Sequence, residues 1–207
     1  MNKTIALAMT ATLLAVSPKI DAQTMIGPNN IKLESDLLTP EALWAMGRIG
    51  SSEASPDGKQ IVYQVSYYSV KENKSHQMLF IMDANGKNQK ALTTDAKSES
   101  DAAWIQGGQK IAFIRDGQLW SMNPDGTGRK QLTNDKLGIQ GFRFSPDGKK
   151  VILIKELPYH GTIKENPSDL PLATGRLVTD MNYRHWDHYV ESLLHPFVAD
   201  VAEDGTV

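Results

Sequence analysis

Three histidines and two carboxylates lie close together near the C-terminal end of the sequence, and their types could support metal chemistry. They are His185, His188 and His195, with Asp187 and Glu191 among them. Side chains three or four positions apart on a helix can converge on one metal ion. The spacing is not that of the zinc motif H-E-x-x-H, because a tryptophan and an aspartate separate the first two histidines. We therefore interpret the set as a solvated polar face and predict no metal ligand.

Motifs for nucleophilic catalysis or cofactor binding are missing from the sequence. A nucleophile elbow requires G-x-S-x-G on a strand-to-helix turn, whereas Gly50-Ser51-Ser52 continues as Glu53-Ala54. Neither glycine-rich phosphate motif occurs, and we interpret Gly126-Thr127-Gly128 as a strand-connecting turn. Asp187 and Glu191 could anchor a cationic amine, although acidic residues on an exposed face are common. The sequence thus predicts no catalytic residue and no cofactor.

The composition is that of an ordinary globular protein. The 207 residues are 40% hydrophobic and 22% charged, with a net charge of -2. The charge forms no basic stripe, which makes nucleic acid an unsuitable partner. The absence of cysteine excludes disulfides, thiolate metal sites and a cysteine nucleophile from this sequence.

The first 22 residues have the pattern of a secretory signal peptide. Lys3 precedes an apolar run from Ile5 to Val16, and a more polar segment ends at Ala22. This run is shorter than the ~20 apolar residues that span a bilayer, so a signal peptide is favoured over an uncleaved anchor. We predict cleavage after Ala22, export to the periplasm or beyond, and no membrane contact after removal of the signal peptide.

Residues 23–50 are expected to form an N-terminal lead and one short helix. Thr39-Pro40-Glu41 combines an N-cap hydroxyl, a proline at the first helical position and an acid near the positive end of the dipole. Either Gly47 or Gly50 is expected to end the helix, which should pack on the structure that follows.

Residues 51–207 carry a repeat of short strands. Ser145-Pro146-Asp147-Gly148 fits a turn in which proline presets φ and glycine takes a positive φ, and Ser55-Pro56-Asp57-Gly58 repeats it. Leu92-Thr93 recurs 40 residues on as Leu132-Thr133. A period near 40 with four strand signals per unit is typical of a β-propeller blade. We predict an all-β fold, a partial β-propeller of about two complete four-stranded blades and part of a third.

The third unit is interrupted by a long insertion at about residues 155–195. Asp180 could cap a helix there, with Tyr183, Trp186, Val190, Leu193 and Leu194 on one face. The insertion could be a flap that contacts substrate or a decoration that packs on the propeller. Because a propeller closes with about four to eight blades, we expect the chain to be the N-terminal piece of a longer protein that supplies the missing blades.

Two resemblances add to these inferences. The repeats resemble TolB-type propellers, on the segments Ser55–Lys59, Leu79–Asp83, Leu119–Asn123 and Gln131–Thr133. The leader, the blades and the segments Leu38–Glu41, Ala173–Arg176, Tyr183–Asp187 and His195–Phe197, taken in order, are similar to the start of the dipeptidyl peptidase V group within the prolyl oligopeptidase family of serine peptidases.

The second resemblance implies a function for the longer protein. Such enzymes carry a C-terminal α/β-hydrolase domain with serine, aspartate and histidine, and the propeller admits only short peptides. None of these three catalytic residues can be assigned to a position of this chain. The alternative is a non-enzymatic TolB-like propeller that binds a protein or a cell-envelope partner.

Overall fold

The computed structural model describes residues 25–28, 31, 36–158, 163–164, 177–178 and 192–207. The predicted signal peptide lies outside these ranges. No helix among the described residues is long and apolar enough to cross a membrane.

Helix α1, Pro40–Ala45, begins where the sequence predicts. The Thr39 hydroxyl accepts a hydrogen bond from the Ala42 backbone N–H at 3.2 Å, which satisfies one donor of the first turn. The helix ends before Gly47, while Gly50 lies inside the next strand, so the expectation that Gly50 might end the helix is wrong. As expected, α1 packs on the first sheet, with Ala42 buried against it.

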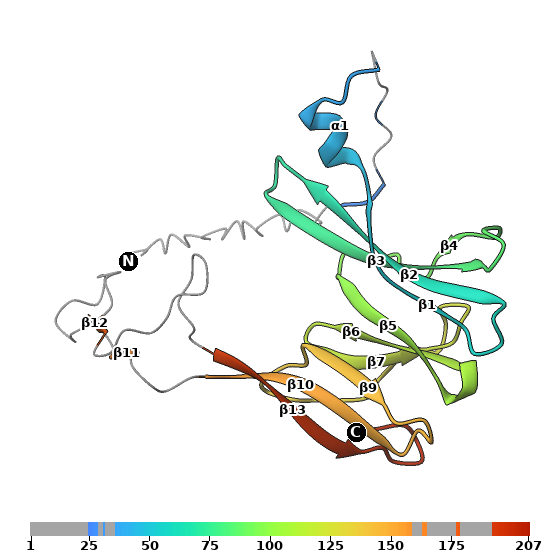
Figure 1. Ribbon diagram of the computed structural model, residues 1–207, viewed down its shortest axis with the longest axis vertical. Coiled ribbons are helices and arrows are strands. Elements are labelled where there is room, and N and C mark those ends of the chain that lie inside the picture. The colour runs from blue at the N-terminus through green and yellow to red at the C-terminus, as the bar shows by residue number, and fades with distance from the viewer. Residues whose placement is uncertain (1–24, 29–30, 32–35, 159–162, 165–176, 179–191) are drawn as a thin grey trace, which may run out of the picture.

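Three antiparallel sheets of three or four strands each follow the helix (Figure 1). The first has the order β1-β2-β3-β4, with bounds Arg48–Ala54, Gln60–Ser69, Lys74–Asp83 and Lys90–Ala91. The second has the order β5-β6-β7-β8, with bounds Glu99–Ile105, Lys110–Arg115, Gln118–Met122 and Lys130–Gln131. The third has the order β13-β10-β9, with bounds Ser192–Asp200, Lys150–Pro158 and Gly141–Phe144. This confirms the predicted all-β, propeller-like fold, while the number of blades in a closed ring stays a prediction.

The turns form for the reasons that their residues suggest. At Ser145–Gly148 the Gly148 N–H donates to the Ser145 carbonyl at 2.9 Å, with φ +69° at Gly148. Asp116 and Gly117 both have positive φ, 51° and 68°, as a two-residue type I′ hairpin requires. The second and third strands of the first sheet, β2 and β3, are ten residues each, whereas β6 and β7 of the second sheet are six and five.

The core lies between neighbouring sheets. Val62, Leu79 and Ile81 of the first sheet pack against Ile111 and Phe113 of the second, all at most 1% exposed. The other face of the second sheet packs in the same way on the third, through residues that include Ala112, Ile114, Leu119, Val151 and Leu153. Each fully buried side chain of this size contributes ~1.5–3 kcal/mol, so the faces shared by two sheets hold the sheets together.

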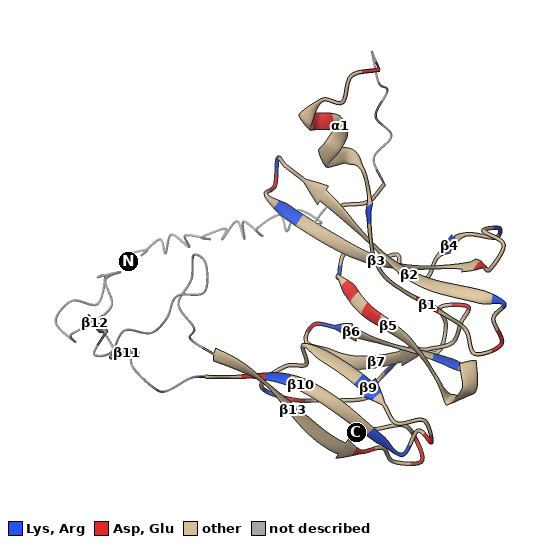
Figure 2. Ribbon diagram, in the orientation of Figure 1, with Lys and Arg blue, Asp and Glu red and all other residues tan. Residues whose placement is uncertain are grey.

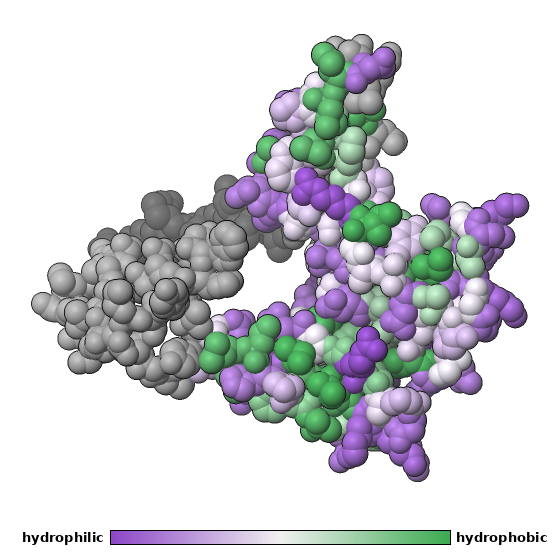
Figure 3. Space-filling view, viewed as in Figure 1, coloured by the Kyte–Doolittle hydropathy of each residue, from purple (hydrophilic) through white to green (hydrophobic). Residues whose placement is uncertain are grey.

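The outer face of the third sheet remains exposed within the described structure. Ile152 of β10 pairs with Val198 of β13, and these side chains are 44% and 67% exposed. Figure 3 shows apolar surface over this sheet and over α1, and Figure 2 shows that charged residues gather mainly at turns and strand ends.

The structure corrects two boundaries. Strand β1 begins at Arg48, before the predicted start of the repeat at Ser51. Strands β10 and β13 pair as far as Pro158 and Ser192, so the insertion is confined to residues 159–191 rather than 155–195.

The end of the predicted helix is also wrong. Leu193 and Leu194 belong to β13, because β10 continues far enough to supply backbone partners opposite them at Leu157 and Glu156. The other proposed helix residues, Asp180, Tyr183, Trp186 and Val190, lie outside the described residues. Within the insertion the structure describes a short pair, β11 Ile163–Lys164 with β12 Leu177–Val178.

Candidate functional site

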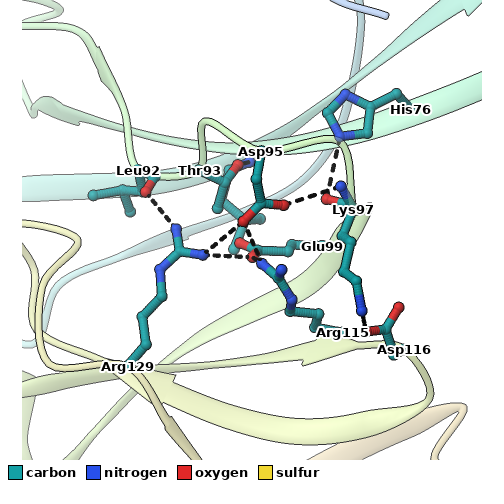
Figure 4. Close-up of polar contacts among 10 residues, drawn as sticks. His76, Leu92, Thr93, Asp95, Lys97, Glu99, Arg115, Asp116 and Arg129 are labelled. Atoms are coloured by element: carbon teal, nitrogen blue, oxygen red, sulfur yellow. Dashed lines mark hydrogen bonds and ion pairs between the residues drawn. The ribbon is translucent and has the colours of Figure 1, made fainter. Parts of the chain in front are cut away.

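The densest group of charged side chains lies where the first sheet passes into the second. Asp95 lies in the connector between β4 and β5, Glu99 begins β5, Arg115 ends β6, and Arg129 precedes β8 (Figure 4). The β5–β6 register places Glu99 directly opposite Arg115. Pairing of the two strands therefore delivers one carboxylate and one guanidinium to the same point.

Glu99 is the centre of this junction cluster, which we define as Asp95, Glu99, Arg115 and Arg129. Its side chain is fully buried, and its Oε1 accepts hydrogen bonds from Nη1 of Arg115 and, at 3.0 Å, from Nη1 of Arg129. Arg115 also donates to Asp95 Oδ2 at 2.8 Å. Glu99 Oε2 has no hydrogen-bond partner among the described residues. Within the described structure, the Glu99 carboxylate is thus bound through Oε1 alone.

The electrostatics of the two acids differ. Burial raises the pKa of Glu99 and outweighs the hydrogen bonds and charges of the two arginines. Burial also acts to raise the pKa of Asp95, but the Arg115 hydrogen bond and the Lys97 N–H bring that pKa below its ordinary value. For Arg115, burial alone would lower the pKa, but hydrogen bonds to Asp95 and Glu99 raise it.

Arg129 links this cluster to the backbone of the preceding connector. Its Nη2 donates to the Leu92 carbonyl at 2.8 Å. Two arginines therefore neutralise two carboxylates, and one of the arginines fixes the path of the chain between sheets. Because these charged groups pair with one another, the arrangement is suited to positioning the sheets, and it presents no nucleophile.

The next junction repeats one part of this arrangement. Asp135 lies after β8, and its carboxylate accepts a hydrogen bond from Nζ of Lys155 in β10. Asp135 and Lys155 stand 40 positions after Asp95 and Arg115, respectively. An aspartate in the connector thus pairs at both junctions with a cation 20 residues on.

A second feature is a hollow beside α1, with a volume of about 390 Å³. Its lining is mostly apolar and comes from the N-terminal lead, the helix and β2, namely Pro28, Ile31, Ala42, Ala45, Met46, Gly47, Val65 and Tyr67. At Gly47 an added Cβ would lie 2.7 Å from Cε1 of Tyr67 and 2.8 Å from Cγ1 of Val65. A larger residue at this position would therefore displace side chains that line the hollow.

Of the histidines and acids singled out by sequence, the structure describes one, His195. His195 is exposed in β13, where its Nδ1 lies 3.1 Å from the Leu193 carbonyl oxygen. His185, Asp187, His188 and Glu191 lie outside the described residues. Across the part of the chain that the structure describes, no group of three or more His, Asp or Glu side chains is placed to hold a metal ion.

Two glycine-containing segments lie in a strand and a turn, and the turn at Gly126-Thr127-Gly128 is the strand-connecting turn that the sequence predicts. Gly50-Ser51-Ser52 lies in strand β1 and not on a strand-to-helix turn. Gly126 and Gly128 both have positive φ, 90° and 62°, in the turn before β8. Neither segment forms a nucleophile elbow or a phosphate cradle.

Sequence reasoning missed the junction cluster, although the repeat contained a signal for it. Glu99 stands 40 positions before Ile139, and both side chains are buried, at 0% and 2% exposed. A glutamate in place of a core isoleucine predicts a buried ion pair, since burying an unpaired carboxylate is costly.

Comparison with known proteins identifies relatives along the whole chain. It is 36% identical over 207 residues to dipeptidyl-peptidase 5 of Porphyromonas endodontalis, covering 98% of this chain and 30% of that protein. It is 39% identical over 214 residues to dipeptidyl-peptidase 5 of Porphyromonas gingivalis, covering 100% and 30%. The chain thus spans about 30% of the length of these curated relatives. No family model matches it.

The fold has a counterpart among solved structures. The acylaminoacyl peptidase of Pyrococcus horikoshii superposes with a TM-score of 0.55 over 76% of this chain and 24% of that one, at 13% identity. At this identity the likeness concerns the fold alone.

Proposed function

We propose that this chain, a homologue of dipeptidyl-peptidase 5 over its whole length, supplies blades to the β-propeller of an exported serine peptidase. In this proposal the propeller admits short peptides to a hydrolase domain that lies outside the chain. The observation that carries it is the 36–39% identity to two dipeptidyl-peptidases over 98–100% of this chain.

The packing of the sheets supports the propeller part of the proposal. Both internal interfaces bury apolar faces, and the outer face of β10 and β13 has the same apolar character at Ile152 and Val198. An exposed face of this kind is expected where another sheet of a repeat protein packs. Further blades would bury it.

The position of the insertion supports a role in access. Residues 159–191 leave the third sheet at Pro158 and return at Ser192, and these two residues pair directly across β10 and β13. The connectors between sheets and the turns between second and third strands lie at this same end of the sheets. We propose that the insertion stands at the entrance through which peptides pass.

The test uses the complete protein and a variant in which an Asn-Gly turn joins Pro158 to Ser192. Such a turn closes a hairpin whose strands already pair at these positions. The complete protein should release dipeptides from short reporter peptides and leave long peptides intact. The variant should still release dipeptides from the short peptides. It should also cleave the long peptides, because the insertion no longer restricts the entrance.

A matched control replaces residues 70–73, the turn between β2 and β3, with the same Asn-Gly turn. It changes a turn at the same end of a neighbouring sheet and should leave size selection unaltered. Absence of dipeptide release by the complete protein would overturn the peptidase and leave a binding propeller. Unchanged selection in the variant would overturn only the entrance role.

Export is tested separately by sequencing the N-terminus of the mature protein. Cleavage after Ala22 and recovery outside the cytoplasm are expected, and Leu14→Arg in the apolar run should retain the precursor. A mature exported protein that begins at Met1 would contradict the signal peptide.

A further inference from the structure

His76 is a buried histidine that the proposed function does not use. It lies in β3 opposite Tyr67 of β2, and only 3% of its surface is exposed. Buried histidines usually have defined partners for both ring nitrogens. The partners of His76 come from two distant parts of the chain.

Both ring nitrogens face backbone carbonyl oxygens. Nδ1 lies 2.7 Å from the oxygen of Ile26, 50 residues earlier, and Nε2 lies 3.2 Å from the oxygen of Lys97, 21 residues later. A carbonyl oxygen only accepts hydrogen bonds. A neutral imidazole has one N–H and one lone pair, whereas the imidazolium has two N–H groups. The neutral ring can therefore satisfy one of these contacts, and the protonated ring can satisfy both.

The charged groups around His76 largely pair with one another. The Lys97 side chain pairs with Asp116 in the β6–β7 turn, and the Lys97 N–H donates to Asp95 at 3.0 Å. Beyond them, Glu99 at the start of β5 is bound by Arg115 from β6 and Arg129 from before β8. The segment 25–28 contains no titratable side chain, and Tyr67 is the titratable group on β2 opposite the ring. The carbonyl oxygens of Ile26 and Lys97 are thus the contacts of His76 that differ most between its neutral and its protonated ring.

We propose that His76 is a clasp that holds residues 25–28 as a strap over the first sheet, and that the clasp is complete only when both ring nitrogens are protonated. The strap ends in Pro28, which forms one wall of the hollow beside α1. Ala42, which is 4% exposed, also lines the hollow. Loss of the Ile26 contact releases the strap and opens the apolar hollow. This inference does not depend on the peptidase function.

The experiment uses a cysteine as reporter, because the chain contains none of its own. Ala42→Cys is introduced into the complete protein with His76, His76→Gln or His76→Phe, and labelling of Cys at position 42 by a thiol reagent is followed by peptide mass mapping. At each pH the labelling rate of the His76→Phe protein is divided by the rate of each other protein, which cancels the ionisation of the thiol. His195→Phe is the matched control, since His195 is an exposed histidine far along the chain.

Labelling should be slowest with His76 at acidic pH. His76→Phe should be about five-fold faster there, the factor of one ordinary hydrogen bond, and this ratio should shrink as the pH rises and the ring loses its second proton. His76→Gln, which cannot titrate, should give a ratio independent of pH, and His195→Phe should equal the parent.

Two results would overturn the proposal. A ratio near one at every pH would show that His76 does not hold the strap. A ratio above one without pH dependence would show that a single N–H suffices. Exchange of the Leu43 N–H, which donates to Thr39 at 3.0 Å, reports whether α1 stays folded. If His76→Phe unfolds it, the His76→Gln protein replaces His76→Phe as the reference rate in the ratio, with the same two overturning outcomes.

Discussion

The two junctions between sheets share one ion pair and differ in the residue beside it. Asp95 pairs with Arg115 at the first junction, and Asp135 pairs with Lys155 at the second. In both cases an aspartate in the connector pairs with a cation in the second strand of the following sheet. Arg115 is the last residue of β6, and Lys155 lies in β10. The shared pair is therefore part of how one blade follows another.

The difference lies at Glu99 and Ile139. Ile139 packs with Leu119 and Val151 and needs no polar partner for its side chain. Glu99, at the equivalent position, requires Arg115 and Arg129 and still leaves Oε2 without a partner in the described structure. A buried ion pair contributes less to stability than its contacts suggest, because desolvation opposes it. We infer that the first junction gains a defined geometry from this cluster and the second gains stability from apolar packing.

Removing one partner of the buried cluster should have the largest effect. Arg115→Met leaves Glu99 with Arg129 alone in a buried site, and should lower the free energy of opening at the first junction by about 3–5 kcal/mol. Hydrogen exchange of the slowest β5 and β6 amides in the complete protein measures this. Lys155→Met is the matched control and should cost about 1 kcal/mol, since Asp135 is 24% exposed and can be hydrated. Equal losses would remove the distinction between the junctions.

Converting the first junction to the chemistry of the second should cost much less. Glu99→Ile gives the first junction the isoleucine that the second has at Ile139, and Arg129→Gln gives position 129 the residue found 40 positions earlier, just before β4 of the first sheet, Gln89. Replacing a buried ion pair by apolar packing is often neutral, so the double variant should lie within about 1 kcal/mol of the parent. Either single change should cost more than the double change, and the coupling follows from the double-mutant cycle. Additive losses would show that the two residues act independently.

Glu99 and Asp135 should contribute to the pH dependence of their junctions in opposite directions, while Asp95, whose pKa is lowered, adds to the first junction a contribution with the sign of Asp135. Because the pKa of Glu99 is raised by burial, its contribution to stability is present below the unfolded value of ~4.3 and is lost as pH rises through the folded pKa. The pKa of Asp135 is lowered, mainly by the Lys155 hydrogen bond. Its contribution is present above the unfolded value of ~3.9 and is lost as pH falls.

Hydrogen exchange between pH 3 and 8 separates these contributions. Glu99→Gln should abolish the loss of stability at rising pH in β5, and Asp135→Asn should abolish the loss at falling pH around β10. A response to rising pH in β5 that Glu99→Gln leaves unchanged would contradict the assignment of this response to the buried Glu99.

Turns and the helix start could be predicted from sequence where residues close together in the chain determine them. Gly148 takes a positive φ in any context, and Thr39 caps the helix through a neighbour three residues away. The end of the insertion could not be predicted this way. Leu193 and Leu194 fit a helix face as well as a strand. They form a strand because β10 is long enough to pair with them, and the residue spacing alone does not reveal the length of β10.

The junction cluster was beyond local reasoning for a different reason. Arg129 is 30 residues from Glu99, and its approach depends on how β8 sits beside the preceding connector. The 40-residue repeat nevertheless shows that Glu99 and Ile139 occupy equivalent positions. This comparison predicts that the buried carboxylate of Glu99 has a cationic partner, but it does not identify Arg129 as that partner. The side chains of residues 179–191 remain predictions from sequence.

The smallest effect is expected at the exposed pair of the first junction. Lys97 and Asp116 form a salt bridge whose side chains are 55% and 51% exposed. Exposed pairs contribute ~0–1 kcal/mol and are weakened by salt, so Lys97→Gln should change opening of β5 by less than about 1 kcal/mol, and added salt should reduce the difference. The Lys97 carbonyl that faces His76 is unaffected by this substitution. Lys97 lies in the β4–β5 connector and Arg115 binds Asp95 of the same connector, but the Lys97 side chain is far more exposed. A loss of stability as large as that of Arg115→Met would therefore mean that burial does not determine how much each ion pair contributes.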